Sequence, residues 1–308
     1  MEPTRYDLVI TYDWEYDRDF VRLVDEAARG RGLATLVVPP AEARRTLEAF
    51  RAGEVDFLVL LDRASGSSPD VIALQASAAE KGRDVIEALD KLRWASDKAT
   101  MHLEFLTAGL QTPHTVILPS FNAEPDVALT PELLAPLGVP FVVKPANTTG
   151  GSVGVVADAS GPADVRTARG TYPADKYLLQ EKVVPETRDG RRFWFRGFYV
   201  LGEVHLTWWD DGTHLYEELG PDEAADLGLD PIFAVVRAIA RVSRLRFFST
   251  EVARDVRGRI VVIDYVNDIC DMRLRSAHPD GVPDAIVGRI ADRIAAHAGA
   301  AAARVRSD

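Results

Sequence analysis

The chain has 308 residues and a mass of 33.8 kDa, a length that suits two or three packed subdomains rather than one small core. Its formal net charge of -11 argues against nucleic acid as the main partner, because an acidic protein repels a phosphate backbone. No apolar run approaches the ~18 residues of a membrane span, and the start lacks the basic and apolar regions of a signal peptide. The single cysteine, Cys270, excludes an internal disulfide and cysteine-rich zinc sites. We therefore expect a cytoplasmic protein that binds neither nucleic acid nor membranes.

Strand and helix patterns alternate over residues 1–95. Short apolar runs favour strands, whereas apolar residues three and four positions apart favour helices. Such alternation is typical of a parallel sheet covered by helices. We expect a small N-terminal α/β domain over 1–95, with strands at 6–12, 33–39 and 55–61 and helices at 19–30 and 41–51.

Residues 96–175 are predicted to form a central subdomain. A helix is expected over 95–110, with Ser96 or Asp97 as its N-cap, because short polar side chains accept the free N–H groups of a first turn. Prolines and polar residues over 118–140 indicate a loop with a short helix. Two strands follow, at 141–143 and 153–157.

Residues 176–308 are predicted to form a C-terminal subdomain around one antiparallel sheet, because turns such as Leu201-Gly202 and Arg257-Gly258 separate its apolar runs. The expected strands are 177–184, 193–201, 203–209, 247–253 and 260–266, and the expected helices are 231–245 and 283–305. Together the three regions predict an α/β (α+β) fold with a parallel N-terminal sheet and an antiparallel C-terminal sheet.

The first chemical signal is a strand that ends in Lys144 and leads into a loop with Gly150, Gly151 and Ser152. Glycines allow backbone N–H groups to approach phosphate oxygens, and the lysine adds a positive charge. Taken alone, such glycines more often form a simple hairpin turn. The loop is not a Walker loop, because no G-K-[ST] follows the glycines.

The second signal lies in the segment 177–185, an apolar strand that turns charged at Glu181 and Lys182 and stops at Pro185. The backbone of such a segment can pair with the edge of an adenine ring. The alternative is an edge strand with a charged exit.

The third signal is a pair of strands around a tight turn at Arg257-Gly258. A symmetric hairpin centred there places Glu251 opposite Asp264, with Cβ atoms roughly 5 Å apart. Two carboxylates among apolar neighbours repel each other, and a hard divalent metal would resolve the repulsion. The repulsion predicts that neutralising Asp264 stabilises the metal-free protein. A solvated face with both carboxylates in water is the alternative.

Two further residues follow this hairpin. Asn267 offers an amide oxygen as a third metal ligand, but two spacer residues separate it from Asp264. A regular strand would send these side chains to opposite faces, so either a bulge restores the geometry or Asp268 replaces Asn267. Arg273 is a candidate clamp for a substrate carboxylate or phosphate. A surface arginine paired with Asp268 or Asp271 is the alternative.

In this order, the motifs resemble the ATP-grasp superfamily over roughly residues 90–285. They are Asp97-Lys98 before a helix, Lys144 on a strand, the 150–154 glycine loop, the 180–184 segment, Arg196 on a strand before a hairpin, and the hairpin with Glu251, Asp264 and Asn267. The similarity is greatest to D-alanine–D-alanine ligase and to ligases that extend peptides with amino acids.

The resemblance implies a role for each matching residue. Lys98 and Lys144 would contact ATP phosphates, and the loop with Gly150, Gly151 and Ser152 would close over them. Adenine and ribose would lie against Glu181, Lys182, Val184 and Glu186. Arg196, Arg273 and Lys144 would act in catalysis, and Glu251, Asp264 and Asn267 would bind Mg²⁺, with Mn²⁺ as an alternative ion.

The resemblance also implies a reaction: ATP phosphorylates a carboxylate, and an amine attacks the acyl phosphate, releasing ADP and phosphate. The substrates would be small carboxylates and amines, such as amino acids or peptide-like molecules, and the protein would be a homodimer. A kinase of the same fold and a non-catalytic ATP-binding module are the alternatives. The chain departs from relatives at Trp208 and Trp209, where they carry basic residues; we expect one tryptophan in the core and one in an acceptor pocket.

Overall fold

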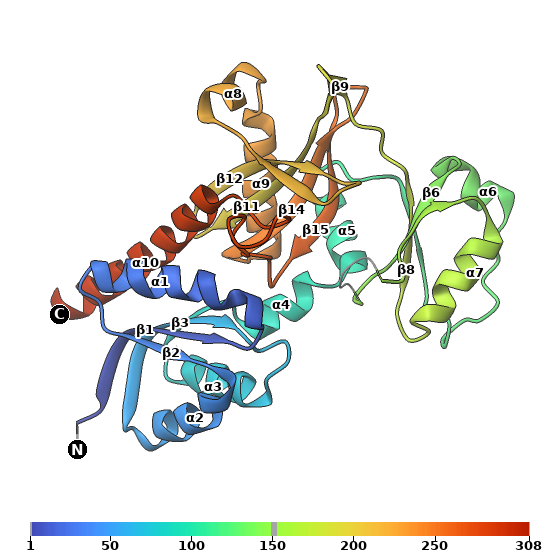
Figure 1. The fold of residues 1–308 in the computed structure, drawn as a ribbon. Helices are drawn as coiled ribbons and strands as arrows, with labels where there is room; N and C mark the ends of the chain where they lie inside the picture. Colours follow the sequence, from blue (N-terminus) through green and yellow to red (C-terminus); the bar gives the residue numbers. More distant parts are fainter. Residues whose placement is uncertain (1, 149–152, 308) are drawn as a thin grey trace.

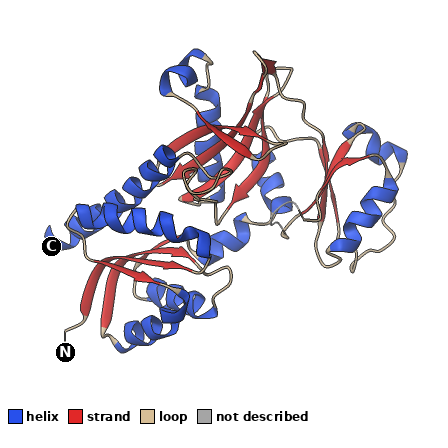
Figure 2. Cartoon of the chain, in the orientation of Figure 1, coloured by secondary structure: helices blue, strands red, loops and turns tan. Residues whose placement is uncertain are grey.

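The structure is a computed structural model and describes residues 2–148 and 153–307. Its elements form three main β-sheets, each packed against helices (Figure 1). The N-terminal sheet is parallel and the other two are antiparallel, and the three sheets form separate groups of strands (Figure 2). This combination confirms the predicted fold class.

The N-terminal sheet has the strand order β2-β1-β3-β4. Its strands and the helices between them are β1 (Thr4–Tyr12), η1 (Glu15–Asp17), α1 (Arg18–Gly30), β2 (Thr35–Val38), η2 (Pro40–Glu42), α2 (Ala43–Ala52), β3 (Val55–Arg63), α3 (Pro69–Glu80) and β4 (Asp84–Ile86). Side chains alternate between its two faces. Val9 packs with α2 and α3, whereas Leu8 and Ile10 pack with α1 and with α10 (Asp284–Ser307). The last helix of the chain therefore covers the first sheet, beside α1 (Figure 1).

Two helices lead from this sheet to the next, α4 (Leu89–Ala95) and α5 (Lys98–Thr107). The single helix expected over 95–110 is therefore wrong at its start. Asp97 has extended backbone and its side chain accepts a hydrogen bond from the Thr100 N–H, which makes it the N-cap. The Lys98 N–H donates to the Ala146 carbonyl, and this bond ties the start of α5 to the second sheet.

The second sheet has the order β5-β8-β6-β7. Its elements are β5 (Thr115–Leu118), α6 (Pro131–Leu134), η3 (Ala135–Leu137), β6 (Phe141–Pro145), β7 (Val156–Ala159), α7 (Pro162–Thr171) and β8 (Tyr177–Glu181). The strand expected at 153–157 begins three residues later. The strand expected at 177–184 pairs with β5 and β6, so its assignment to the same sheet as the later strands is wrong.

The third sheet has the order β13-β12-β11-β14-β15. Its strands and the helices between them are β11 (Trp194–Val200), β12 (Glu203–Asp210), β13 (Leu215–Glu218), α8 (Pro221–Asp226), α9 (Asp230–Ser243), β14 (Phe247–Arg254) and β15 (Ile260–Asn267). A small two-stranded ribbon, β9 (Thr187–Arg188) and β10 (Arg191–Arg192), precedes them in the chain. Helix α9 packs across β11 and β15. Among the described residues, no helix is both long and apolar enough to span a membrane.

Gly197 on β11 allows α9 to approach the sheet. A Cβ atom at this position would lie 2.7 Å from Val236 Cγ2 and 3.3 Å from Leu206 Cδ2. We expect Gly197→Ala to lower the free energy of unfolding by about 1–3 kcal/mol, because overpacking forces backbone or side-chain shifts. Urea unfolding measures the loss. The control is Gly288→Ala in α10, where a Cβ meets no atom within 4 Å and should stabilise the helix. Equal stability changes in the two variants would contradict this packing.

Candidate functional site

Strands β14 and β15 bring Glu251 opposite Asp264, as predicted. The route differs from the symmetric turn that was expected. Near the turn, Arg254 pairs with Ile260, which is one residue out of the expected register. A register shift between Glu251 and Val252 then returns the strands to the expected pairing of Glu251 with Asp264. Because directly paired residues present their side chains on the same face, both carboxylates face one side of the sheet.

A second irregularity lies at the end of β15. Ser249 pairs with Asn267, so two steps along β14 correspond to three along β15 between Asp264 and Asn267. This is the bulge that the two-residue spacing requires if both side chains are to share a face. Asn267 lies close enough to Asp264 to help lower the pKa of that carboxyl.

Three cationic side chains converge on the paired carboxylates. Arg196 on β11 pairs with Glu251 across the sheet, and its Nη1 lies 3.1 Å from Glu251 Oε1. Lys98 at the start of α5 places its Nζ 3.7 Å from Asp264 Oδ1. Lys144 on β6 is 8% exposed and donates from Nζ to the Ile263 carbonyl at 3.0 Å. The residues that the resemblance selected from distant segments thus meet in one place.

The electrostatics of this cluster correct the expected repulsion. Burial raises the pKa of Glu251, and the charge of Asp264 adds to this effect while Arg196 opposes it. Burial also acts to raise the pKa of Asp264, but Lys98 and Lys144 outweigh it and hold the pKa below its usual range. Lys98 and Lys144 therefore balance the charge of Asp264, whereas the raised pKa of Glu251 shows that Arg196 balances that carboxylate only in part.

Lys144 is the cation of the three whose charged form the surroundings disfavour most clearly. Burial and the neighbouring charge of Lys98 outweigh the attraction of Asp264 and Glu251, and together they lower the pKa of Lys144 to about 8. Its Nζ also lies 5.3 Å from the centre of the Tyr265 ring. A buried cation with a depressed pKa gains from an additional anion, and a phosphate group would supply one.

Several buried polar atoms of the cluster lack hydrogen bonds within the described part of the chain. They are Nε and Nη1 of Arg196 and Nδ2 of Asn267. Arg196 Nη1 is near Glu251, but the contact has ion-pair distance without hydrogen-bond geometry. Because buried donors are normally satisfied, these groups fit a site that receives anionic oxygens.

The donor set for a cation consists of two carboxylates and one amide oxygen. These are hard oxygen ligands, the kind that Mg²⁺ prefers when it also binds nucleotide phosphates. Within residues 2–148 and 153–307, no three His, Cys, Asp or Glu side chains gather closely enough to hold a metal by themselves. A metal at Glu251, Asp264 and Asn267 would therefore take further ligands from phosphate oxygens or water.

The segment after β8 links the second and third sheets. The Val184 carbonyl accepts from the Val256 N–H at 3.2 Å, next to a bridge between Pro185 and Asp255. Glu181 Oε1 accepts from the His114 N–H at 3.1 Å. Val184 is 60% exposed, so its side chain is open to a ligand.

Two charged residues of the same segment have partners inside the protein. Lys182 pairs with Asp158, and Glu186 pairs with Arg254 through Oε2 at 2.7 Å. A ribose contact from Glu186 would have to compete with this ion pair. The roles of Lys182 and Glu186 in nucleotide binding stay predictions.

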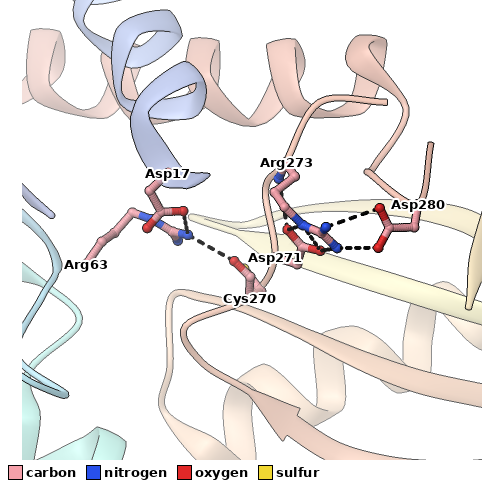
Figure 3. A network of polar contacts seen from close by, with 6 residues as sticks. All are labelled: Asp17, Arg63, Cys270, Asp271, Arg273 and Asp280. Atoms are coloured by element: carbon pink, nitrogen blue, oxygen red, sulfur yellow. Dashed lines mark hydrogen bonds and ion pairs between the residues drawn. The ribbon is translucent and has the colours of Figure 1, made fainter. Parts of the chain in front are cut away.

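Arg273 is held by carboxylates of its own loop. Its Nη2 lies 2.7 Å from Asp271 Oδ2 and 2.9 Å from Asp280 Oδ2 (Figure 3). This matches the pairing with Asp271 that was the alternative to a substrate clamp. Beside it, Arg63 joins Asp17 to the Cys270 carbonyl, which anchors the loop after β15 to the N-terminal sheet. A catalytic role for Arg273 would require it to leave these partners.

The glycine loop at Gly150, Gly151 and Ser152 lies outside the described residues, and its phosphate-binding role stays a prediction.

Trp208 and Trp209 lie on opposite faces of β12, as the alternation of side chains along a strand requires. Trp208 packs against Phe195 in the core, with ring centroids 4.6 Å apart. Trp209 lies beneath the Arg196 guanidinium, whose Cζ is 4.6 Å from its centroid.

Two residues of the cluster were not predicted. Trp194 donates from Nε1 to Glu251 Oε2 at 3.2 Å. Tyr265 lies under Lys144 and its hydroxyl contacts His102 Nδ1 and Gln180 Nε2, each at 2.9 Å. Strand alternation places Trp194 on the same face as Arg196 and was available in the sequence. The contact of Tyr265 with a lysine from another sheet was not.

Glu87 follows β4 and is 2% exposed, and burial raises its pKa to about 7 against the opposing charge of Arg246. Between the ordinary pKa of 4.5 and this value, the folded protein holds a proton that the unfolded chain releases. Stability is therefore expected to fall as pH rises from 4.5 to 7. The loss of stability between pH 5 and pH 8, measured by urea unfolding, should be about 1–3 kcal/mol larger in wild type than in Glu87→Gln. An equal loss in both proteins would contradict this assignment.

No protein-family model matches the chain, and no curated protein sequence matches it. Several solved structures match the chain along nearly its whole length. A RimK domain ATP-grasp protein from Sphaerobacter thermophilus DSM 20745 superposes with a TM-score of 0.61 at 21% identity, covering 93% of this chain and 99% of that one.

Two other similar structures are described as enzymes. The ATP-grasp ligase PsnB, complexed with its precursor peptide PsnA2 and AMPPNP, has a TM-score of 0.60 at 14% identity over 97% of this chain and 99% of that one. The D-cycloserine synthetase DcsG has a TM-score of 0.54 at 17% identity over 94% and 99%. The agreement extends over nearly the whole length of each chain. The protein described here therefore has the ATP-grasp fold.

Proposed function

We propose that the protein is an ATP-dependent ligase that joins a carboxylic acid to an amine. The observation that carries the proposal is the convergence of Lys98, Lys144 and Arg196 on the carboxylates of Glu251 and Asp264. Three cations and an oxygen-rich hairpin match the needs of a metal-bound triphosphate. The similar structures support the same reading, since PsnB and DcsG are a ligase and a synthetase.

In the proposed reaction, a carboxylate oxygen of the substrate attacks the γ-phosphorus of ATP and the bond to ADP breaks. The amine nitrogen then attacks the acyl carbon, the bond to phosphate breaks, and the nitrogen loses a proton. Lys144 and Lys98 would hold the phosphates, and Arg196 would neutralise charge on the transferred group. Glu251, Asp264 and Asn267 would hold Mg²⁺, which would neutralise phosphate charge; PsnB has been solved with Mg and ADP.

The proposed nucleotide position follows from the two sheets. The 181–186 segment connects the second and third sheets, and Val184 is exposed beside that connection. We propose that adenine lies against this segment, with the triphosphate directed toward Lys144. The substrates would be an amino acid or a peptide-like molecule and an amine.

The test is incubation of the protein with Mg-ATP and pools of amino acids and amines, with ADP and free phosphate both measured. Phosphate release that depends on a carboxylate and an amine together is expected. ADP with phosphorylated product but without free phosphate would indicate a kinase instead. Absence of turnover across the pools, with nucleotide still bound, would indicate a binding module.

A further inference from the structure

The guanidinium of Arg196 has two neighbours that attract it in different ways. Glu251 faces it from β14, and Arg196 Nη1 lies 3.1 Å from Glu251 Oε1. The ring of Trp209 lies against it from β12, with Arg196 Cζ 4.6 Å from the ring centroid. A carboxylate binds a guanidinium through its N–H groups, whereas an aromatic ring attracts the positive charge through its face. Trp209 can therefore hold the cation without occupying the donors that an anionic ligand needs.

The donors of Arg196 are largely unused. Its Nε and Nη1 are buried and have no hydrogen-bond partner within residues 2–148 and 153–307. A buried donor without a partner costs free energy, so this arrangement needs a contact that stabilises the charge by other means. The ring of Trp209 supplies such a contact, and the two nitrogens stay available for phosphate oxygens.

Trp209 is itself held firmly by its surroundings. Its pair on β13, Tyr216, packs against it with ring centroids 4.5 Å apart, and His214 stacks on it at 5.6 Å. The strand that carries Tyr216 is tied to the loop after β15, because Arg275 Nη1 donates to the Tyr216 carbonyl at 2.6 Å. A side chain whose position is fixed by packing can fix the orientation of a long, flexible neighbour. Trp209 gives this support to the side chain of Arg196.

The adjacent residue Trp208 provides an internal comparison. The two tryptophans are similarly buried, with 6% and 8% of their surface exposed. Trp208 also lies under an arginine, since Arg191 Cζ is 5.2 Å from its centroid, but it points to the other face of the sheet. A general effect of losing a buried tryptophan would appear at both positions, whereas an effect through Arg196 would appear only at Trp209.

We propose that Trp209 is a positioning residue for Arg196, whose guanidinium it holds against the ring face so that the N–H groups point to the terminal phosphate of the nucleotide. The inference rests on the proposed function, because that function assigns the transferred phosphate to Arg196. It adds that the sheet sets the orientation of this cation from β12, by a contact that leaves its donors free.

The test compares ADP with AMPPNP, because only AMPPNP has a terminal third phosphate. Calorimetric titration of the full chain in Mg²⁺ gives the dissociation constant of ADP divided by that of AMPPNP, which we call the nucleotide ratio. Arg196→Gln should lower this ratio at least about tenfold, the effect of losing one charge-assisted contact. Trp209→Met should lower it about threefold or more, because the aromatic face is lost, and Trp209→Phe should keep most of it. In the Arg196→Gln background, Trp209→Met should have no further effect.

Trp208→Met is the matched control and should keep the wild-type nucleotide ratio. A second measurement leaves the shape of the protein unchanged. Fluorinated tryptophan, incorporated throughout the chain, withdraws electron density from the ring face and weakens its attraction for a cation. The ratio should fall in fluorinated wild type and stay constant in fluorinated Trp209→Phe. This comparison decides the question if Trp209→Met does not fold.

The outcomes separate this inference from the proposed function. An unchanged ratio in Trp209→Met and in fluorinated wild type, or an equal fall in Trp208→Met, would overturn the positioning role and leave the proposed ligase function standing. An unchanged ratio in Arg196→Gln would remove Arg196 from the terminal phosphate, and the role of Trp209 would fall with it. If wild type binds neither nucleotide, the proposed function fails, and this inference fails as its consequence.

Discussion

Lys144→Met is expected to reduce kcat/KM for ATP by about 10²–10³-fold, the loss that follows removal of one preorganised charge from a phosphate or oxyanion site. Methionine keeps the straight, apolar stem of the lysine and removes its charge. The lost contacts are those of Nζ, which donates to the Ile263 carbonyl and lies near Asp264. The measurement is ADP formation at several ATP concentrations.

The same variant should fold at least as well as wild type. Burial, the largest cause, lowers the pKa of Lys144 to about 8. Below that pH the folded protein still carries the charged lysine, and this buried charge costs stability. Between pH 8 and the ordinary value of 10.5, the folded protein binds fewer protons than the unfolded chain, and wild-type stability should rise with pH. Removing the charge should therefore be neutral or stabilising at pH 7.

The control is Lys81→Met, because Lys81 donates to the Phe50 carbonyl in the N-terminal domain, away from the cluster. It should retain ATP turnover. Near-normal turnover in Lys144→Met, or equal losses in both variants, would remove Lys144 from the proposed phosphate site.

Asp264→Asn is expected to lose metal-dependent turnover and also to lower stability at pH 7, by about 1–3 kcal/mol, because it leaves buried lysines without their counter-charge. Burial acts to raise the pKa of Asp264, but Lys98 and Lys144 hold it below 3.8. This contribution to stability is present above the unfolded pKa and is lost as pH falls through the folded value. The gap between wild type and variant should therefore narrow toward pH 3.

Glu251→Gln is the matched comparison on the facing strand. Burial raises the pKa of Glu251, so its ionised form is less favoured by the fold than that of Asp264. The glutamine should cost less stability than Asp264→Asn, although Arg196 loses its ion pair. Urea unfolding of both variants at pH 7 measures the difference. A gain in stability for Asp264→Asn would restore the repulsion that the sequence suggested and contradict the charge balance described here.

Local patterns in the sequence predicted the parts of the structure that depend on neighbouring residues. Short apolar runs placed β1, β3, β11, β14 and β15 close to their observed bounds. The facing of Glu251 and Asp264 was also predicted, although the hairpin reaches it through a register shift that symmetric turn geometry does not contain. A bulge before Asn267 was one of two alternatives that side-chain parity allowed, the other being the replacement of Asn267 by Asp268, and the observed pairing has the bulge.

Features that depend on distant contacts could not be predicted. Helix α3 was missed because it has no polar face to give it a clear period, and β4 has three residues, too few for alternation to be visible. The packing of α10 on β1 joins the two ends of the chain, which no local pattern records. The same limit applies to the site, where Lys98 and Lys144 reach Asp264 from other elements and balance its charge, which looked uncompensated in the hairpin alone.

The central claim is that the hairpin carboxylates and the three cations together bind a metal-bound triphosphate. Calorimetric titration of AMPPNP into the full chain, in excess Mg²⁺ and then in EDTA, tests it most directly. We expect AMPPNP to bind in Mg²⁺ and to bind at least about tenfold more weakly in EDTA, a difference of ~1.4 kcal/mol. In Asp264→Asn, we expect the affinity for AMPPNP to be the same with and without Mg²⁺. Nucleotide binding that is the same with and without Mg²⁺ in wild type, or that survives unchanged in Asp264→Asn, would contradict it.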